Sequence, residues 1–409
     1  MIDKKNLTQV EEAKKIILNH INQTNSEEIH IMESFGRVID KPIFAKLNNP
    51  PVDVSSMDGY GVTEYDKVNN TKNLKCLGIS QAGKKNNFKI TDGETVMVFT
   101  GAEIPKGAKS VVIQENAKKT SKDYIKINHY NQNSYIRKKG MDFKKGEELF
   151  AKGHKLNAIS IALIASSGIS WVLVKQKPKI AILSNGDELI RPGDFFEDFQ
   201  DNKIVSSNSL FLYFFIKQCG GDPVILPIAA DNIESIGNSL KNNTTFDLII
   251  SSGGASVGKY DLIKKYLMEG KNNFILDLWK IAMRPGKPLF FGRYNKIPFL
   301  GLPGNPVSTG VCSIIFLKPI IEKFLNEPIK LDYDFIETDT DLEKNDERQE
   351  YLRSMIIIKN NKKYVKPFIK QDSSQLNIFS NSNCFIVREP NAPFLPKGKR
   401  VKVIKIPYL

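Results

Sequence analysis

Short apolar runs alternate with stretches of helical spacing between residue 178 and about residue 326. Such alternation predicts a parallel α/β sheet, because each helix carries the chain back to the start of the next strand. The predicted strands cover 179–184, 223–228, 247–252 and 298–302, and the predicted helices cover 209–218, 233–240, 262–268 and 307–324.

The flanking regions have a β pattern. Between residues 46 and 140, short runs rich in β-branched and aromatic residues (LKCLGI, ETVMVFTG, KSVVIQE, YIKINHY) stand between turn residues, which predicts a small β domain. From residue 327 the pattern is again that of strands, with a hairpin expected to turn at Asn360-Asn361. Together these patterns predict a multidomain protein of the α/β-plus-β class.

Two further segments have helical character. Residues 7–24 carry apolar residues at helical spacing, and Thr8 with Glu11 has the spacing of a capping box. Residues 158–174 are apolar but shorter than the roughly 20 residues that a membrane helix needs. We interpret them as a helix that ends near Gly168 and a strand over 171–174. The N-terminus has no apolar core of a secretory signal, so we expect a cytoplasmic protein without a membrane partner.

Composition narrows the classes of function. The 409 residues suggest two to four domains, and the formal charge is +14. The lysines are scattered rather than gathered on one stripe, which favours a solvated surface over a nucleic-acid site. The four cysteines form no Cys-x-x-Cys pair, so neither a zinc site nor a disulfide framework is expected.

Glycine-rich loops follow the third and fourth predicted strands. Ligands of parallel α/β sheets bind beyond the carboxyl ends of the strands, and glycines let backbone N–H groups approach an anion closely. We therefore predict a pocket for an anionic ligand, although ordinary strand-to-helix turns remain an alternative for each loop taken alone. The predicted binding residues are Ser252, Gly253, Gly254, Ser256, Gly258, Pro303, Gly304, Asn305 and Pro306.

Three carboxylates follow three different strands of the predicted sheet: Glu188, Asp231 and Asp261. Acids grouped beside an anion site are the hard oxygen ligands that Mg²⁺ requires. The alternative is that each acid caps the following helix or lies in its first turn. Near the fourth strand, Lys280, Arg284 and Lys287 supply cations for an anionic ligand, unless they belong to a solvated basic loop.

The motifs SSMDGYGV, TGAEIPKGAKSVV, GMDFKKGEEL, AILSNGDEL, SSGGASVGKYD, MRPGKPL and GLPGNPVS occur in this order along the chain. As a set they resemble the molybdopterin molybdenumtransferases, which include the gephyrin E domain. The resemblance runs from about residue 8 to the C-terminus. It implies a molybdopterin-binding α/β domain with a parallel-rich sheet, an elongated first domain with an inserted β domain, and a C-terminal β-barrel. The implied boundaries are 1–45 with 142–176, 46–141, 177–326 and 327–409.

The resemblance also implies an activity: insertion of molybdate into adenylylated molybdopterin, assisted by Mg²⁺, with release of AMP and formation of molybdenum cofactor. It implies a homodimer whose subunits share the active site, and the adenylyltransferase of the same pathway is a further candidate partner. The catalytic residues carried over are Asp58, Thr100, Asp142, Glu188, Asp231 and Asp261, with Glu188, Asp231 and Asp261 as metal ligands.

Several positions depart from the family's usual pattern. Arg284 stands where a lysine is common, and Asn232 replaces a frequent aspartate. Lys259 and Met141 stand where an acid is common, and Ser55-Ser56 replaces Ser-Ala. Two other functions stay open at this point. One is molybdopterin adenylylation, which the α/β domain alone resembles. The other is a binding or scaffolding protein of the same fold without turnover.

Overall fold

The computed structural model describes residues 7–193, 202–241, 245–253, 262–269, 273–329 and 331–406. The chain forms two compact units: Met1–Glu27 with Lys175–Leu409, and Glu28–Val174. The boundaries of the four predicted domains remain a prediction. Within the described residues, no helix is long and apolar enough to cross a membrane.

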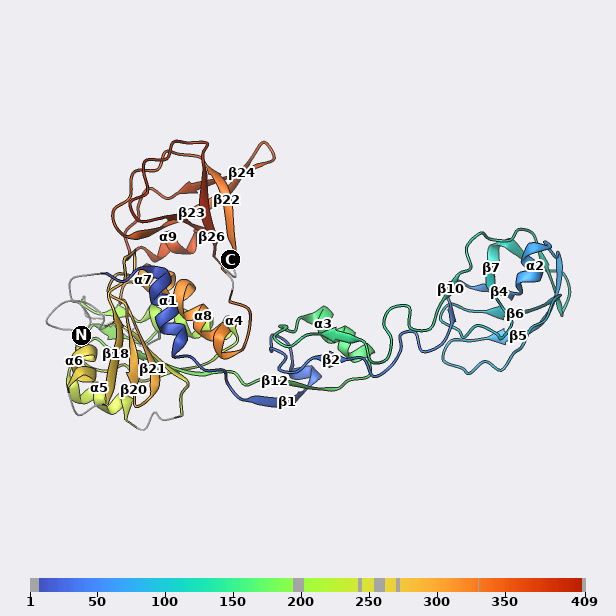
Figure 1. Cartoon of the computed structure of the whole chain (residues 1–409), viewed down its shortest axis with the longest axis horizontal. Coiled ribbons are helices and arrows are strands. Elements are labelled where there is room, and N and C mark those ends of the chain that lie inside the picture. Colours follow the sequence, from blue (N-terminus) through green and yellow to red (C-terminus); the bar gives the residue numbers. More distant parts are fainter. Residues whose placement is uncertain are drawn as a thin grey trace. The chain divides into compact units, whose positions relative to one another are not determined.

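A six-stranded mixed sheet forms the centre of the first unit (Figure 1). Four neighbouring strands are parallel, and two antiparallel strands complete one edge. The four predicted strands are confirmed, whereas the two antiparallel strands were missed. In spatial order the strands are β16 (Asp222–Ile225), β13 (Lys179–Ser184), β17 (Leu248–Ser252), β21 (Ile297–Leu302), β20 (Phe290–Tyr294) and β18 (Phe274–Trp279).

Helices cover both faces of this sheet. One face carries α5 (Ile233–Leu240) and α6 (Leu262–Met268), whose apolar residues pack on alternate strand residues such as Ala181 and Ile249. The other helices are α1 (Val10–Asn19), α4 (Ser207–Cys219), α7 (Pro306–Cys312) and α8 (Lys318–Phe324), with a π-helical turn Ser313–Leu317 joining the last two. The predicted helices are confirmed within a few residues at their ends.

The predicted capping box at Thr8 is wrong. Helix α1 begins after Gln9, which makes no side-chain cap. Thr8 instead pairs with the backbone beside β18: its N–H donates to the Lys280 carbonyl over 3.1 Å, and its carbonyl accepts from Ala282 N–H over 2.8 Å. Tertiary backbone pairing therefore uses the residue that the local pattern assigned to a cap.

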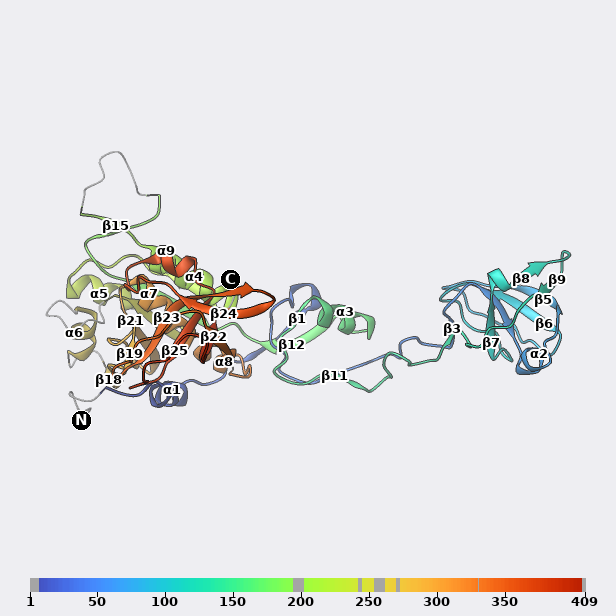
Figure 2. The same cartoon turned by 90° about the horizontal axis from the view of Figure 1, so that it is seen from above.

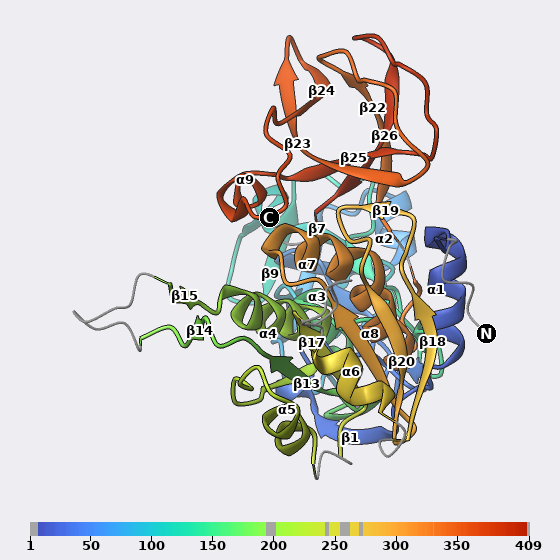
Figure 3. The same cartoon turned by 90° about the vertical axis from the view of Figure 1, so that its left-hand side faces the viewer.

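The C-terminal part of the first unit is a closed β-barrel, as predicted (Figure 3). The barrel closes because β23 pairs with both β24 and β25. The predicted hairpin joins β23 to β24, with Asn360 and Asn361 at φ +48° and +59° in the turn. The elements are β19 (Met283–Arg284), β22 (Tyr333–Thr338), β23 (Gln349–Lys359), β24 (Lys362–Pro367), α9 (Leu376–Ser380), β25 (Cys384–Arg388) and β26 (Arg400–Lys405).

The second unit contains the predicted small β domain, in which β5, β6 and β7 lie in one six-stranded sheet (Figure 2). The rest includes three two-stranded pairings, α2 (Glu64–Val68) and the predicted helix α3 (Ala158–Ser166). Gly168 follows α3 at φ +84°. The sheet strands are β4 (Gly59–Val62), β5 (Asn73–Ser80), β6 (Glu94–Val98), β7 (Ser110–Ile113), β8 (Ala117–Lys119) and β9 (Tyr124–Ile127). The paired strands are β1 (Ser26–His30) with β12 (Trp171–Lys175), β2 (Ile43–Phe44) with β11 (Glu148–Phe150), and β3 (Val54–Ser55) with β10 (Ile136–Arg137).

Candidate functional site

The loops after β17 and β21 meet at the carboxyl edge of the sheet. Gly253 takes φ +98°, a conformation that favours glycine, and its N–H donates to the Leu302 carbonyl over 3.2 Å. A Cβ on Gly304 would lie 3.5 Å from the Gly253 Cα. This close approach brings two of the predicted glycine loops together and places both glycines in the walls of two cavities.

Asp231 follows β16 and is held by the loop after β13. Its carboxylate accepts from the Asn185 side-chain amide over 3.0 Å and from the Asp187 N–H over 3.4 Å. Its own N–H donates to the Asp187 carboxylate over 2.9 Å. The next residue, Asn232, caps α5 by accepting from Ser235 N–H, so the capping role considered for Asp231 belongs to its neighbour.

Glu188 lies in the wall of the smaller cavity, of about 330 Å³. Asn185, which contacts Asp231, lines the same cavity. Five of the predicted binding residues also line it: Ser252, Gly253, Gly304, Asn305 and Pro306. The structure thus brings the Glu188 loop and the two glycine loops to one cavity. Asp261 lies outside the described residues, together with Gly254, Ser256 and Gly258.

Glu188 lines the smaller cavity, and Asp231 is hydrogen-bonded to Asn185 in the wall of that cavity. Their carboxylate oxygens are of the donor type that fits Mg²⁺. The described residues alone contain no cluster of three or more His, Cys, Asp or Glu side chains that could hold a metal ion. A complete metal site would therefore need a ligand from elsewhere, such as Asp261 or a substrate phosphate.

A larger cavity, of about 820 Å³, lies between the glycine loops and the β-barrel. Arg284, Lys287 and Pro303 line it, as the sequence predicted for an anion site. The barrel contributes residues that sequence reasoning missed: Arg348, Glu350, Tyr351, Arg353, Gln371, Asp372 and Ser373.

Arg353 is the most unusual residue in this wall. Only 2% of it is exposed, yet its Nε has no hydrogen-bond partner among the described residues. One terminal nitrogen donates to the Asp372 carbonyl over 3.3 Å. Burial lowers the pKa of Arg353 to about 10, so the guanidinium remains charged at neutral pH. A buried charge with an incompletely used donor set in a cavity wall is suited to an oxyanion.

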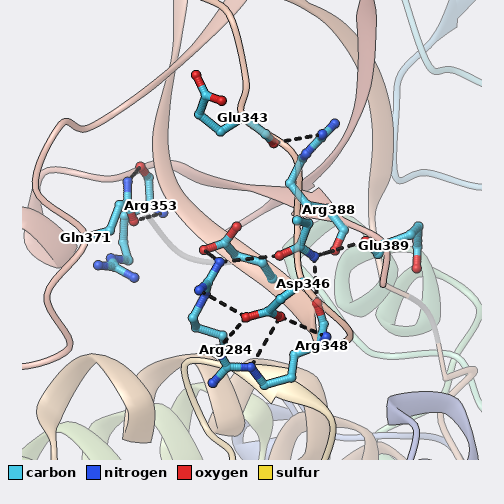
Figure 4. A network of polar contacts seen from close by, with 10 residues as sticks. Arg284, Glu343, Asp346, Arg348, Arg353, Gln371, Arg388 and Glu389 are labelled. Atoms are coloured by element: carbon cyan, nitrogen blue, oxygen red, sulfur yellow. Dashed lines mark hydrogen bonds and ion pairs between the residues drawn. The ribbon is translucent and has the colours of Figure 1, made fainter. Parts of the chain in front are cut away.

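Asp346 joins two arginines at the mouth of the barrel (Figure 4). Its carboxylate accepts from both nitrogens of the Arg348 fork, over 3.3 and 2.5 Å, and from the Arg348 N–H over 2.9 Å. Arg284 adds an ion pair over 3.3 Å. The hydrogen bonds from Arg348 are the main cause that lowers the pKa of Asp346 to about 2.

Lys280 is not one of the described residues that line either cavity. It has φ +66°, and its ammonium lies 4.3 Å from the ring centre of Trp279. Its predicted role toward an anionic ligand remains a prediction.

The three remaining predicted residues belong to the second unit. Asp58 lies on the turn before β4, and Thr100 donates to its Oδ1 through both the backbone N–H and the hydroxyl. The backbone hydrogen bond is the main cause that lowers the pKa of Asp58. Asp142 accepts from the Asn49 side-chain amide over 2.9 Å, and the two residues also pair through the backbone.

Models of three protein families match successive parts of the chain. They are the MoeA N-terminal region (domain I and II) over residues 8–168, a probable molybdopterin binding domain over 181–323, and the MoeA C-terminal region (domain IV) over 336–406. The molybdopterin molybdenumtransferase of Haemophilus influenzae is 31% identical, and the match covers 93% of this chain and 94% of that protein. The chain belongs to the molybdopterin molybdenumtransferase family. This family of enzymes acts in molybdenum cofactor biosynthesis.

Other relatives agree with the family assignment. The molybdopterin molybdenumtransferase of a Nostoc species is 29% identical over 98% of this chain and 94% of its own length. Gephyrin of Dictyostelium discoideum is 29% identical over 98% of this chain, which spans 62% of that protein. The crystal structure of a molybdopterin biosynthesis protein from Pyrococcus horikoshii is 25% identical and matches with a TM-score of 0.82 over 98% of this chain and all of that one.

Proposed function

We propose that this molybdopterin molybdenumtransferase homologue inserts molybdate into adenylylated molybdopterin, with release of AMP, and so forms molybdenum cofactor. One observation carries the proposal most directly. The charged, almost fully buried Arg353 lies in the wall of an 820 Å³ cavity beside the glycine loops. Such a group favours a small oxyanion, because an arginine fork matches the geometry of tetrahedral oxygens.

The cations of the larger cavity would bind and orient the anions. Arg353 and Lys287 would hold the molybdate oxygens at the barrel side. The glycine loops at Gly253 and Gly304 would let the backbone approach the pterin nucleotide closely. Holding both reactants in neighbouring cavities lowers the entropic cost of bringing them together.

Glu188 and Asp231, with Asp261, would hold Mg²⁺ at the smaller cavity. When bound, the ion would polarise the pyrophosphate and neutralise its charge. The chain's own contribution is the positioning of these acids. Asn185 and Asp187 fix the Asp231 carboxylate by hydrogen bonds, so its remaining lone pairs have a set direction.

We further propose a cytoplasmic homodimer with a shared active site. Asp58, Thr100 and Asp142 lie in the second unit, whereas Glu188 and Asp231 lie in the first. In a shared site, the second unit of one subunit would complete the site of its partner. The adenylyltransferase of the same pathway is the expected source of the adenylylated substrate.

The test compares wild type with Arg353→Gln in the release of AMP from adenylylated molybdopterin. We expect Arg353→Gln to raise the molybdate concentration needed for half-maximal release by about tenfold or more, because one charge-assisted contact is lost. Arg293→Gln is the matched control, since it removes a two-bond arginine–carboxylate pair with Asp277 on β18. Equal molybdate dependence of wild type and Arg353→Gln would contradict the proposed anion site.

A further inference from the structure

Arg284 does not present a free guanidinium to the larger cavity. One terminal nitrogen binds Glu350 Oε1 over 2.7 Å and also lies 3.3 Å from Asn345 Oδ1. The other binds Asp346 Oδ2 over 3.3 Å. Both terminal nitrogens of Arg284 are thus engaged by barrel acceptors, while its buried Nε has no partner among the described residues. These contacts reduce the capacity of Arg284 to bind a substrate anion.

Glu350 is a barrel carboxylate whose negative charge acts on Arg353. Both side chains line the larger cavity, and the Glu350 side chain is 16% exposed. The Glu350 charge acts on Arg353, since it opposes the lowering of the Arg353 pKa that burial causes. Without a partner of its own, Glu350 would add negative charge to the wall that must accept an anion.

We propose that Arg284 is a positioning residue that binds Glu350 and so keeps Arg353 available for the oxyanion. The inference rests on the proposed function, since it assigns Arg284 a role within that anion site. It replaces the direct anion contact that the sequence predicted for Arg284. The fork of Arg284 is needed because it contacts Glu350 and Asp346 at the same time, which fixes the start of β23 against β19.

The backbone supports this role. Arg284 pairs with Glu350 in the parallel register of β19 and β23, so the two side chains leave neighbouring backbone positions. Asn345 strengthens the same region, because its amide donates to the carbonyls of Arg348, Arg388 and Glu389. Figure 4 shows Arg284, Asp346 and Arg348 grouped in this network.

Binding of molybdate and of sulfate to the full-length protein tests the proposal by calorimetry. We expect Arg284→Gln to weaken the binding of both anions by about tenfold, because the unpaired Glu350 carboxylate in the same cavity wall repels them. The double variant Arg284→Gln/Glu350→Gln should return to within about threefold of wild type. The anion affinity of Arg284→Lys should lie between those of Arg284→Gln and wild type. Arg293→Gln should bind both anions as wild type does.

A direct anion contact predicts a different pattern. If Arg284 bound the anion itself, removing Glu350 would not rescue Arg284→Gln, and this result would overturn the proposal. Unchanged binding by Arg284→Gln would overturn it as well. If Arg284→Gln fails to fold, then Arg284→Lys and Arg284→Lys/Glu350→Gln form the same comparison. The double variant can recover sulfate binding even if wild type shows no molybdate-dependent AMP release. In that case the role of Arg284 stands and the proposed function is wrong.

Discussion

Thr100 donates two hydrogen bonds to a single oxygen of Asp58, over 2.7 Å from its backbone N–H and 2.8 Å from its hydroxyl. Both bonds favour the charged carboxylate, and they act in the direction that lowers its pKa. Asp58 is therefore held ionised and oriented on the turn before β4.

Replacing Thr100 by valine should raise the pKa of Asp58 toward its ordinary value of 3.8, because the hydroxyl bond is lost while the backbone bond remains. The pKa can be measured by NMR titration of the Asp58 carboxyl carbon. Thr120→Val is a suitable control, since the Thr120 hydroxyl bonds to the Tyr124 carbonyl. An Asp58 pKa that is equal in wild type and Thr100→Val would contradict this assignment.

Asp346 should make the first unit sensitive to acid. Its pKa is about 2 in the folded chain against 3.8 as the ordinary value. A lowered pKa contributes stability that is complete above pH 3.8 and is lost as the pH falls toward 2. Asp346→Asn should lower the stability by on the order of 1 kcal/mol at pH 7, since solvent screens a partly exposed pair.

The acid prediction is checked by urea denaturation of the full chain between pH 7 and pH 2.5. The difference between wild type and Asp346→Asn should shrink only as the pH falls below 3.8. Asp332→Asn, at a more exposed site, is the control. A difference that stays constant with pH would show that Asp346 stabilises the fold without its charge.

Phe290 and Gly301 form a tight pair in the sheet core. They face each other on β20 and β21, and a Cβ on Gly301 would lie 2.0 Å from a Phe290 ring carbon. The Phe290 ring also stacks on Phe299 with centroids 5.7 Å apart. Gly301→Ala should therefore destabilise the first unit by about 1–3 kcal/mol through overpacking.

Thermal unfolding measures this cost. Gly61→Ala is the matched control, because its nearest neighbour would be the Ala108 Cβ at 3.4 Å, an ordinary contact. Equal melting temperatures for Gly301→Ala and wild type would mean that the Phe290 ring can move aside freely.

The elements of the α/β sheet could be predicted from the sequence because its buried strands are short apolar runs between turn residues. The antiparallel strands β18 and β20 could not, because the basic loop that they flank dominates the sequence pattern of that region. Thr8 was assigned to a cap because local spacing carries no information about the distant backbone at Lys280, with which it pairs.

The candidate-site residues that directly follow a strand of the sheet could be predicted from the sequence. Asp231, Glu188 and the glycine loops follow from that rule. Arg353 was not found, although an arginine next to apolar strand residues, in the segment YLRSM, is a pattern that could have indicated it. Its importance depends on the cavity between the barrel and the glycine loops, which no local pattern describes.

The proposed shared site predicts complementation between two inactive variants. Asp58→Asn and Glu188→Gln should each lose activity, and a mixed dimer would contain one intact site and one doubly altered site. Activity should return to about half of wild type per mixed dimer if the two sites act independently. Each variant incubated alone under the same exchange conditions is the control. No recovery after confirmed subunit exchange would place all the acids of a site in one chain.

Release of AMP from adenylylated molybdopterin, measured with and without molybdate, tests the central claim most directly. Our account predicts that the purified chain releases AMP and forms molybdenum cofactor in a molybdate-dependent reaction. Consumption of ATP and molybdopterin to make the adenylylated compound would indicate an adenylyltransferase instead. Binding of adenylylated molybdopterin without AMP release, at saturating molybdate and Mg²⁺, would contradict the account and indicate a binding protein of the same fold.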